Sequence, residues 1–359
     1  MVRKEIKMKQ ILTFLATLIL IFTLAACGTT GSTATTGTTE QQSATAQSSA
    51  ATNAPASTYA SAEQALAENK DAHDDPGDEE VDLAAAIPVA LDGDSISASG
   101  EGIRVEGSTV TITAAGDYRL SGSLDDGQIE VNATQDDTVR LIFDGVRLNN
   151  TSTAPIHIVE ADKVILYLVD GTTNTISDAA EYVYATADVD EPNAAVFSKA
   201  DLSIYGGGAL TVNGAYMDGI TSKDGLVIAG GNITVTAADD GIRGKDYVVV
   251  SGGALSVTAG GDGLKSDDEE DATRGYIQVS AGTLAVTSGG DALSAQTDVI
   301  ISGGDFNLTA GGGSSAVISD DSSAKGIKGD VGVVIDGGTF VVDAADDAIH
   351  SNGSITVNN

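Results

Sequence analysis

The sequence predicts an all-β protein: a right-handed parallel β-helix with three short strands in each coil of about 22 residues. The first observation is a repeat, because DGITSKDGLVIAGGNITVTAAD, from Asp218, aligns without a gap on DGIRGKDYVVVSGGALSVTAGG, from Asp240. The second is the alternation of apolar and polar residues inside each repeat, which is typical of strands with one buried face. The third is composition, since 43 Gly with 9 Tyr, 6 Phe and no Trp favour repetitive β structure over a compact aromatic core.

Residues 1–26 are predicted to be a bacterial lipoprotein signal peptide. Basic residues within positions 3–9 precede an apolar run, Ile11 to Leu24, and the small residues Ala-Ala then lead into Cys27. The run has 14 residues, which is short for a bilayer span, so a transmembrane anchor with a chance cysteine is the alternative. We expect Cys27 to be lipidated and to hold the chain at the extracellular face of the cell membrane. Met8 is a second candidate start.

Residues 27–90 are predicted to be a tether behind the lipidated cysteine. From residue 28 to about 60 the chain is rich in Ser, Thr, Ala, Gly and Gln, a composition that cannot bury enough apolar surface to fold. Residues 61–90 contain a candidate short helix, SAEQALAENK, and the acidic run DAHDDPGDEEVD. We interpret the acidic run as solvated linker.

The folded part is predicted to consist of an N-terminal cap with irregular first coils, residues 91–190, and regular repeats, residues 191–359. Stretches such as TVRLIFDGV and KVILYLVDG in the first part alternate well but lack the repeat register. The regular coils begin at positions spaced 22, 22, 29, 34 and 22 residues apart, so the two longer coils carry inserts, which we expect at corners. The chain stops partway through a coil, and we expect either further coils or a partner there. The coil starts are Asp218, Asp240, Asp262, Asp291, Lys325 and Asp347.

A pair of glycines separates the last two strands of most coils, at 230–231, 252–253, 303–304 and 337–338. Glycine adopts the positive φ that a tight turn requires without a steric penalty. The pairs therefore predict the corner at which the chain bends from one strand to the next.

A column of aspartates is the main candidate site. Equivalent positions in adjacent coils lie ~4.8 Å apart, so the carboxylates at the coil starts stand in line along one corner. Neighbouring carboxylates at this distance repel by roughly 3–4 kcal/mol at an effective dielectric constant near 20. Several Ca²⁺ ions, which prefer oxygen ligands, would compensate this repulsion. The predicted metal ligands are Asp218, Asp239, Asp240, Asp262, Asp291, Asp346 and Asp347.

Two further groups of charged residues lie near the column. The first insert offers a second candidate ligand loop, composed of Asp267, Asp268, Glu269, Glu270 and Asp271. Basic residues stand three positions after several column residues, and they pair with the aspartates in the alternative interpretation, which leaves no metal. These basic residues, Arg243, Lys265 and Lys328, are also candidate contacts to a ligand.

Composition excludes several classes of function. With 18 Lys and Arg against 52 Asp and Glu, the formal net charge is −34, which disfavours nucleic-acid binding. A single cysteine excludes an intramolecular disulfide framework and a zinc site built from several cysteines. Three histidines leave little for a histidine-based metal site.

The repeat register DGI-x-S/G-K-D, followed by I-x-GG, resembles the carbohydrate-binding β-helix family first described from a cellulose-degrading clostridium. TVTITAAGDYRLSGSLDDGQIEVNA, DGVRLNN and DGTTNTISD are similar to the N-terminal region of that family, and the resemblance covers about residues 91–359. It implies a right-handed β-helix with bound calcium, affinity for acidic plant polysaccharide and cellulose, and a fold like that of polysaccharide lyase family nine. This chain departs from the pattern at Lys325, which replaces a column aspartate, and at Gly261 and Gly290, which replace the first aspartate of the pair.

Three functions compete at this point. The first is non-catalytic, calcium-dependent binding of an acidic polysaccharide such as polygalacturonate, or of cellulose, by a monomeric surface lipoprotein. The second is a calcium-dependent pectate lyase, which needs a base such as a lysine of lowered pKa. Lys325 lies between Asp291 and Asp347 in the column, and these carboxylates would raise its pKa instead. The third is a structural surface protein or adhesin without a sugar ligand.

Overall fold

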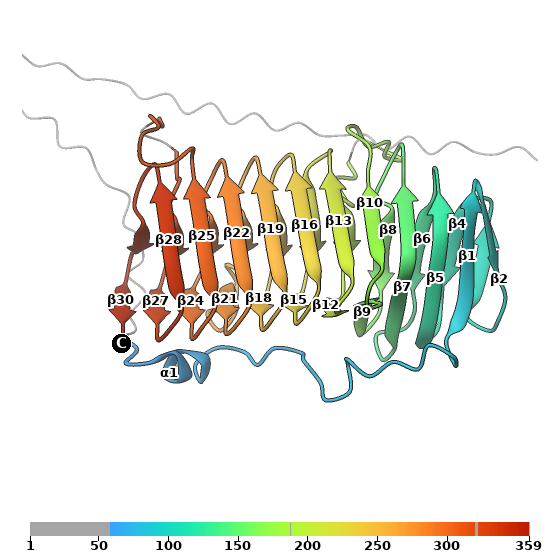
Figure 1. Cartoon of the computed structure of the whole chain (residues 1–359), viewed down its shortest axis with the longest axis horizontal. Coiled ribbons are helices and arrows are strands. Elements are labelled where there is room, and N and C mark those ends of the chain that lie inside the picture. The colour runs from blue at the N-terminus through green and yellow to red at the C-terminus, as the bar shows by residue number, and fades with distance from the viewer. Residues whose placement is uncertain (1–57, 187, 320–321, 359) are drawn as a thin grey trace, which may run out of the picture. The chain divides into compact units, whose positions relative to one another are not determined.

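The computed structural model describes residues 58–186, 188–319 and 322–358, so the predicted signal peptide, Cys27 and most of the Ser/Thr-rich tether lie outside the described residues. The described chain is built from strands, with one five-residue helix, α1 (Ala62–Leu66). From β4 onward each strand pairs in parallel with its equivalent one coil away, and the coils stack in a row (Figure 1). The prediction of an all-β fold of stacked parallel coils is confirmed.

Each regular coil contributes one strand to each of three faces. Face 1 is an eleven-stranded sheet whose strands shorten to three residues from Ile242 onward. Its strands are β3 (Ile103–Glu106), β4 (Thr109–Ile112), β6 (Gln128–Asn132), β8 (Ile156–Glu160), β11 (Ala194–Ser198), β14 (Asp218–Ser222), β17 (Ile242–Gly244), β20 (Leu264–Ser266), β23 (Leu293–Ala295), β26 (Ile327–Gly329) and β29 (Ile349–Ser351).

Faces 2 and 3 continue from the same first strands and together form a nineteen-stranded sheet. Face 2 holds β9 (Lys163–Leu168), β12 (Asp201–Gly206), β15 (Gly225–Ile228), β18 (Tyr247–Val250), β21 (Tyr276–Val279), β24 (Asp298–Ile301), β27 (Gly332–Ile335) and β30 (Ser354–Val357). Face 3 holds β10 (Thr173–Ser177), β13 (Ala209–Gly214), β16 (Asn232–Ala237), β19 (Ala254–Ala259), β22 (Thr283–Ser288), β25 (Asp305–Ala310) and β28 (Thr339–Ala344).

The first coils are irregular. β1 (Ile87–Gly93) pairs antiparallel with β2 (Ser95–Ala98), and β3 pairs antiparallel with β4, so two hairpins close this end of the stack. The long strands β5 (Gly116–Leu124) and β7 (Thr138–Asn149) follow. The first half of β7 pairs with β9 and its last residues pair with β10, so one strand serves both face 2 and face 3.

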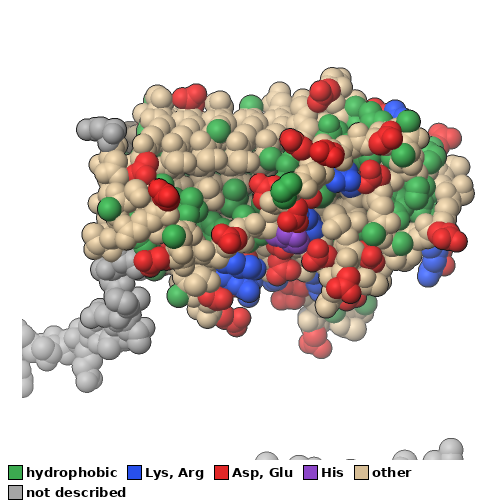
Figure 2. Space-filling model, turned by 90° about the horizontal axis from the view of Figure 1, so that it is seen from below, with side chains coloured by type: hydrophobic (Ala, Val, Ile, Leu, Met, Phe, Trp, Pro, Cys, Tyr) green, Lys and Arg blue, Asp and Glu red, His purple; other side chains and the backbone are tan. Residues whose placement is uncertain are grey.

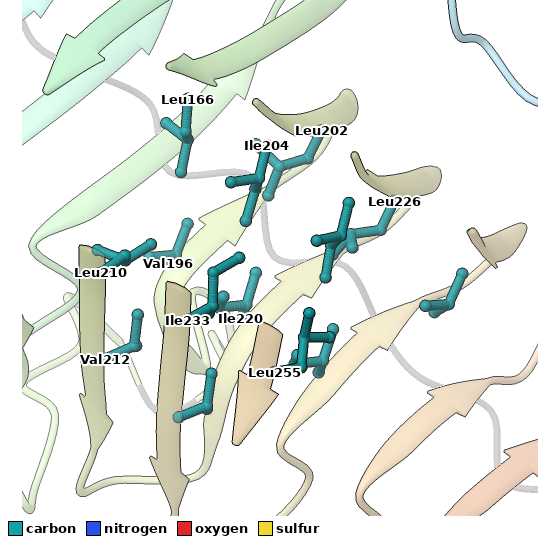
Figure 3. Packing of buried hydrophobic residues seen from close by; sticks show 14 of the residues in the cluster. Leu166, Val196, Leu202, Ile204, Leu210, Val212, Ile220, Leu226, Ile233 and Leu255 are labelled. Carbon is teal, nitrogen blue, oxygen red and sulfur yellow. The ribbon is translucent and has the colours of Figure 1, made fainter. Parts of the chain in front are cut away.

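The core fills the inside of the coils with aliphatic columns. Apolar residues at equivalent positions of the repeat pair in adjacent coils: Ile220 pairs with Ile242, and Ile233 pairs with Leu255. No coil can bury its own apolar residues, so stacking drives folding through the hydrophobic effect. Figure 3 shows side chains from all three faces meeting inside: Val196 and Ile220 from face 1, Leu202, Ile204 and Leu226 from face 2, and Leu210, Val212, Ile233 and Leu255 from face 3.

The glycine pairs form the predicted corners between faces 2 and 3. The second glycine of each pair has a positive φ, for example +89° at Gly231 and +85° at Gly253. A side chain at either position would be strained, which is why the sequence keeps glycine there.

The structure differs from the predicted solvated linker in residues 58–86, which we call the strap. The strap runs along the outside of face 2, from the C-terminal coils to the first ones (Figure 1). Its apolar residues, which include Tyr59 and Ala65, cover Val227, Tyr247 and Ile300 of face 2. The composition argument failed here because it does not register partners that lie far away in the sequence.

Ion pairs fix the acidic part of the strap. Lys163, with a side chain only 1% exposed, places its Nζ 2.8 Å from Asp75 and 2.7 Å from Asp78. The backbone N–H of His73 donates to the Tyr247 hydroxyl at 2.8 Å. Figure 2 shows the side of the molecule on which the strap lies, with many Asp and Glu side chains and fewer Lys and Arg among them. No helix in the described residues is long and apolar enough to cross a membrane.

Candidate functional site

The column aspartates stand at the corner between face 3 and face 1, and four of them bond to the next coil. Four carboxylates accept the backbone N–H of the following column residue, and we call them the aspartate ladder. The contacts run from Asp240 N to Asp218 at 3.2 Å, Asp262 N to Asp240 at 2.8 Å, Asp291 N to Asp262 at 2.8 Å, and Lys325 N to Asp291 at 2.7 Å. One oxygen of each carboxylate is thereby used to join coils, a role that the sequence analysis did not foresee.

The other oxygen of each ladder carboxylate faces a donor or a cation from face 1. Lys265 is shared, with its Nζ 2.9 Å from Asp240 and 3.3 Å from Asp262. The Thr221 hydroxyl donates to Asp218 at 3.0 Å. Lys328 lies 3.9 Å from the Asp291 carboxylate. The geometry therefore matches the ion-pair alternative at these positions.

Burial shapes the protonation of the ladder. Desolvation, with the neighbouring charge of Asp240, raises the pKa of Asp218 to about 6. Burial also raises the pKa of Asp262, although Lys265 opposes that shift. Burial alone would lower the pKa of Lys265, but the two carboxylates outweigh it and raise the pKa of the ammonium group. Lys265 is therefore positively charged at neutral pH.

The ladder also explains why glycine replaces the first aspartate of the pair in two coils. A Cβ at Gly261 would lie 2.5 Å from an oxygen of Asp239 and 2.6 Å from an oxygen of Asp240. A Cβ at Gly290 would lie 2.4 Å from an oxygen of Asp262. The carboxylates of one coil occupy the space that a side chain in the next coil would need.

The acidic insert leaves face 1 after β20 and bonds both to itself and to the preceding coil. The Arg243 guanidinium lies 2.5 Å from Asp267, and the buried Asp268 accepts the backbone N–H groups of Glu270 and Asp271 at 2.8 and 3.0 Å. Glu269 makes no contact with the ladder carboxylates. Asp267 and Asp268 of the predicted ligand loop are therefore already engaged by protein groups, and a role for this loop in metal binding stays a prediction.

The last two column positions pair with other residues. Lys325 Nζ lies 2.7 Å from Asp346, and His350 Nδ1 lies 2.9 Å from Asp347. Lys325 thus keeps its place in the column through its backbone N–H and turns its charge toward the following coil.

The described residues offer no ready calcium cage. Within them, no group of three or more His, Cys, Asp or Glu side chains is arranged to hold a metal ion. Calcium needs six to eight oxygen ligands, and the ladder presents carboxylates whose oxygens already accept N–H groups or face lysines. The residues as placed do not fit a calcium ion bound by the protein alone, and calcium binding stays a prediction.

The structure brings the three candidate ligand contacts into one line on face 1. Arg243 pairs in register with Lys265, Lys265 with Ser294, and Ser294 with Lys328. We call Arg243, Lys265 and Lys328 the basic row. Their side chains are 25%, 30% and 27% exposed, so each head group reaches both the ladder and the surface.

Comparison with known proteins gives the same family as the motifs. A family model described as carbohydrate-binding domain-containing protein matches residues 106–359, which include every regular coil. The chain belongs to this carbohydrate-binding domain family. The resemblance inferred from the repeat register is confirmed.

One curated protein and one solved structure are similar to this chain. A carbohydrate-binding domain-containing protein from Acetivibrio thermocellus is 40% identical over 150 residues, which cover 42% of this chain and 52% of the relative. The match thus spans about half the length of that curated protein. A solved structure, described as a gadolinium derivative of the polysaccharide lyase-like protein from C. thermocellum, has 31% sequence identity and a TM-score of 0.61. The similarity covers 76% of this chain and 97% of that one.

Proposed function

We propose that this protein is a non-catalytic, surface-anchored module that binds acidic polysaccharide, such as polygalacturonate, along the basic row of face 1. The observation that carries the proposal is the alignment of Arg243, Lys265 and Lys328 at one position of successive short strands. Membership of the carbohydrate-binding domain family supports the ligand class.

The row has the geometry of a multivalent site. Coils repeat every ~4.8 Å, so the row from Arg243 to Lys328 extends over roughly 14 Å. A polyuronate carries a carboxylate on every sugar, so one chain could meet several cations in turn. Each partly exposed ion pair is worth little, about 1 kcal/mol or less, and affinity would come from their number. A long polymer should bind much better than its monosaccharide.

Calcium enters the proposal as a bridge between protein and polymer. The net charge of −34 repels a polyanion unless cations intervene. Outside the ladder the protein supplies the half-buried carboxylate of Asp239, and carboxylates of the polymer would have to complete most of the oxygen shell. The related structure is described as a gadolinium derivative, and gadolinium, like calcium, is a hard cation that takes oxygen ligands.

Lyase chemistry is disfavoured by the lysines of the corner. A pectate lyase needs a neutral base to remove a proton next to the carboxylate. Carboxylates raise the pKa of Lys265 and of Lys325 against the effect of burial, so both stay protonated. Neither lysine is suited to act as a base.

The predicted lipid on Cys27 would hold this binding face at the extracellular side of the membrane. A tether of the Ser/Thr-rich kind lets one anchored molecule reach a polymer that is too large to enter the cell. We propose that the protein acts there as a monomer, because a repetitive face provides multivalency without assembly.

Affinity electrophoresis in polygalacturonate gels, with calcium or with chelator, tests the proposal. Wild-type protein should be retarded with calcium, and the triple variant R243Q/K265Q/K328Q should migrate as it does in a gel without polymer. Lys223→Gln is the matched control, because Lys223 pairs with Glu191 away from the row. Equal mobility of the wild type in both gels would favour the adhesin alternative. Absorbance from accumulating unsaturated product would favour the lyase alternative.

A further inference from the structure

A hollow in the surface lies at the same corner as the aspartate ladder, but in the irregular first coils. It is an open cavity of about 600 Å³ above the ends of β5, β7 and β10. This volume falls within the range of about 300–1,000 Å³ that is usual for small-molecule sites. We call it the corner pocket. Several of its residues lie in the stretches that carry the family resemblance, but none was predicted from the sequence as a site residue.

The floor of the corner pocket crosses three consecutive coils. Leu124 pairs with Leu148, and Asn149 pairs with Ser177, so the residues that end these strands stand in register. Three coils span ~10 Å, which is enough for a short stretch of a sugar chain. Asp125, Asn149 and Ser177 line this floor.

One wall is formed by residues 178–183, which follow β10 and lie beyond the strand ends. Tyr182 stacks on Tyr216 with ring centroids 4.2 Å apart, and its hydroxyl donates to Asp178 at 2.7 Å. The Tyr184 hydroxyl donates to the Pro192 carbonyl at 2.7 Å, and the Val183 N–H donates to the Ser152 carbonyl at 2.8 Å. The wall is thus held in place before any ligand arrives, which lowers the entropy cost of binding.

The polar groups of the pocket are available to a ligand. Within the described chain, four lining side chains make no hydrogen bond or ion pair with another residue: Asp125, Asn149, Thr151 and Glu181. Next to them Val183 exposes 76% of its surface, although it is apolar. Free acceptors and donors beside an exposed aliphatic side chain match the alternating hydroxyl and C–H surfaces of a sugar ring.

The charge of the lining selects against an acidic sugar. Asp125, Asp178 and Glu181 contribute carboxylates, and the lining contains no Lys, Arg or His. A uronate in this pocket would meet like charges, which is an effective means of rejection. Sugar hydroxyls, in contrast, donate charge-assisted hydrogen bonds to carboxylates.

We propose that the corner pocket is a subsite for an uncharged sugar residue, with Asn149 and Glu181 as its hydrogen-bonding groups. The proposal rests on the proposed polysaccharide-binding function and deepens it. The pocket lies at the ends of β5, β7 and β10 and the basic row lies on β17, β20 and β26, so a long polymer with neutral and acidic stretches could reach both.

Isothermal titration calorimetry with cellohexaose and with trigalacturonate tests this inference. Wild-type protein should bind cellohexaose, and Asn149→Ala with Glu181→Gln should weaken that binding about tenfold. Ala180→Ile, which adds a branched aliphatic side chain to the wall and no aromatic stacking surface, should weaken it without removing a polar group. Asn232→Ala, at an exposed position on face 3, is the matched control and should bind as wild type does.

The outcomes separate this inference from the proposed function. The pocket assignment is overturned if cellohexaose binds equally to the wild type and to both pocket variants, or does not bind at all. Retention of polygalacturonate by the basic row in that case leaves the proposed function standing. If the wild type binds neither cellohexaose nor polygalacturonate, the pocket assignment and the proposed function are both overturned. Binding of trigalacturonate in the pocket, weakened by Asn149→Ala, contradicts the preference for uncharged sugar.

Discussion

Lys265 is the cation shared by two ladder carboxylates, and its replacement by glutamine tests whether the ladder is an ion-paired or a metal-bound structure. Its Nζ lies 2.9 Å from Asp240 and 3.3 Å from Asp262, with the lysine side chain 30% exposed. Hydrogen bonds to charged groups contribute ~1.5–3 kcal/mol each, and partial exposure reduces this. We expect Lys265→Gln to lose about 2 kcal/mol at pH 7, a decrease in Tm of roughly 4 °C.

The pH dependence of this loss follows from the remaining carboxylates. The pKa of Asp262 is already raised by burial, and Lys265 opposes this shift more than any other group does. Without Lys265 the folded-state pKa rises further above the unfolded value, so this carboxyl stabilises the fold at low pH and loses that contribution as pH rises. The deficit of Lys265→Gln should therefore be smaller at pH 4 than at pH 7.

Thermal unfolding followed by circular dichroism, at both pH values and with calcium or chelator, measures these effects. Lys223→Gln is the control, since Lys223 is 38% exposed and its loss should cost about 1 kcal/mol or less. The ion-paired ladder is contradicted if Lys265→Gln has the Tm of the wild type at pH 7. It is also contradicted if the decrease in Tm is the same at pH 4 as at pH 7. Recovery of the lost Tm on addition of calcium would show that the ladder can bind the metal by itself.

Three further predictions follow from the fold and the site. Burial lowers the pKa of His157 to about 4, so the neutral imidazole contributes stability that is lost as pH falls from 6.5 toward 4. Between pH 7 and pH 5 the free energy of unfolding should therefore fall by about 2 kcal/mol less in His157→Gln than in the wild type. Urea titrations that give the same fall for both proteins would contradict this. A Cβ at Gly225 would lie 1.9 Å from the Tyr247 ring, so Gly225→Ala should cost ~1–3 kcal/mol and make the strap susceptible to limited proteolysis; an intact strap would count against its docking through Tyr247. Chelator should abolish retention in polygalacturonate gels but change the Tm of the free protein by less than about 2 °C, because calcium is expected to bind only with the polymer; a large shift in Tm without polymer would show a metal site within the protein.

The coil follows from the pattern of residues along the chain. Apolar residues recur at fixed positions of a 22-residue repeat, and a column such as Ile220 and Ile242 has one way to be buried, which is to stack. The glycine pairs indicated the corners, because positive φ is a local property of the chain. The positions of the aspartate column and of the basic residues followed from the register alone.

Tertiary structure decided what those residues do. Whether a carboxylate such as Asp240 accepts an N–H group, pairs with Lys265 or binds calcium depends on angles and distances between coils, which the repeat pattern does not contain. The strap was hidden because Lys163 and Asp78 are 85 residues apart, and a composition argument treats such acids as solvated. The corner pocket escaped notice because its residues come from three irregular coils and a loop. Local chemistry fixes strand, turn and register, whereas burial and pairing of charges are properties of the assembled coils, since the free energy of a charge depends on everything that surrounds it.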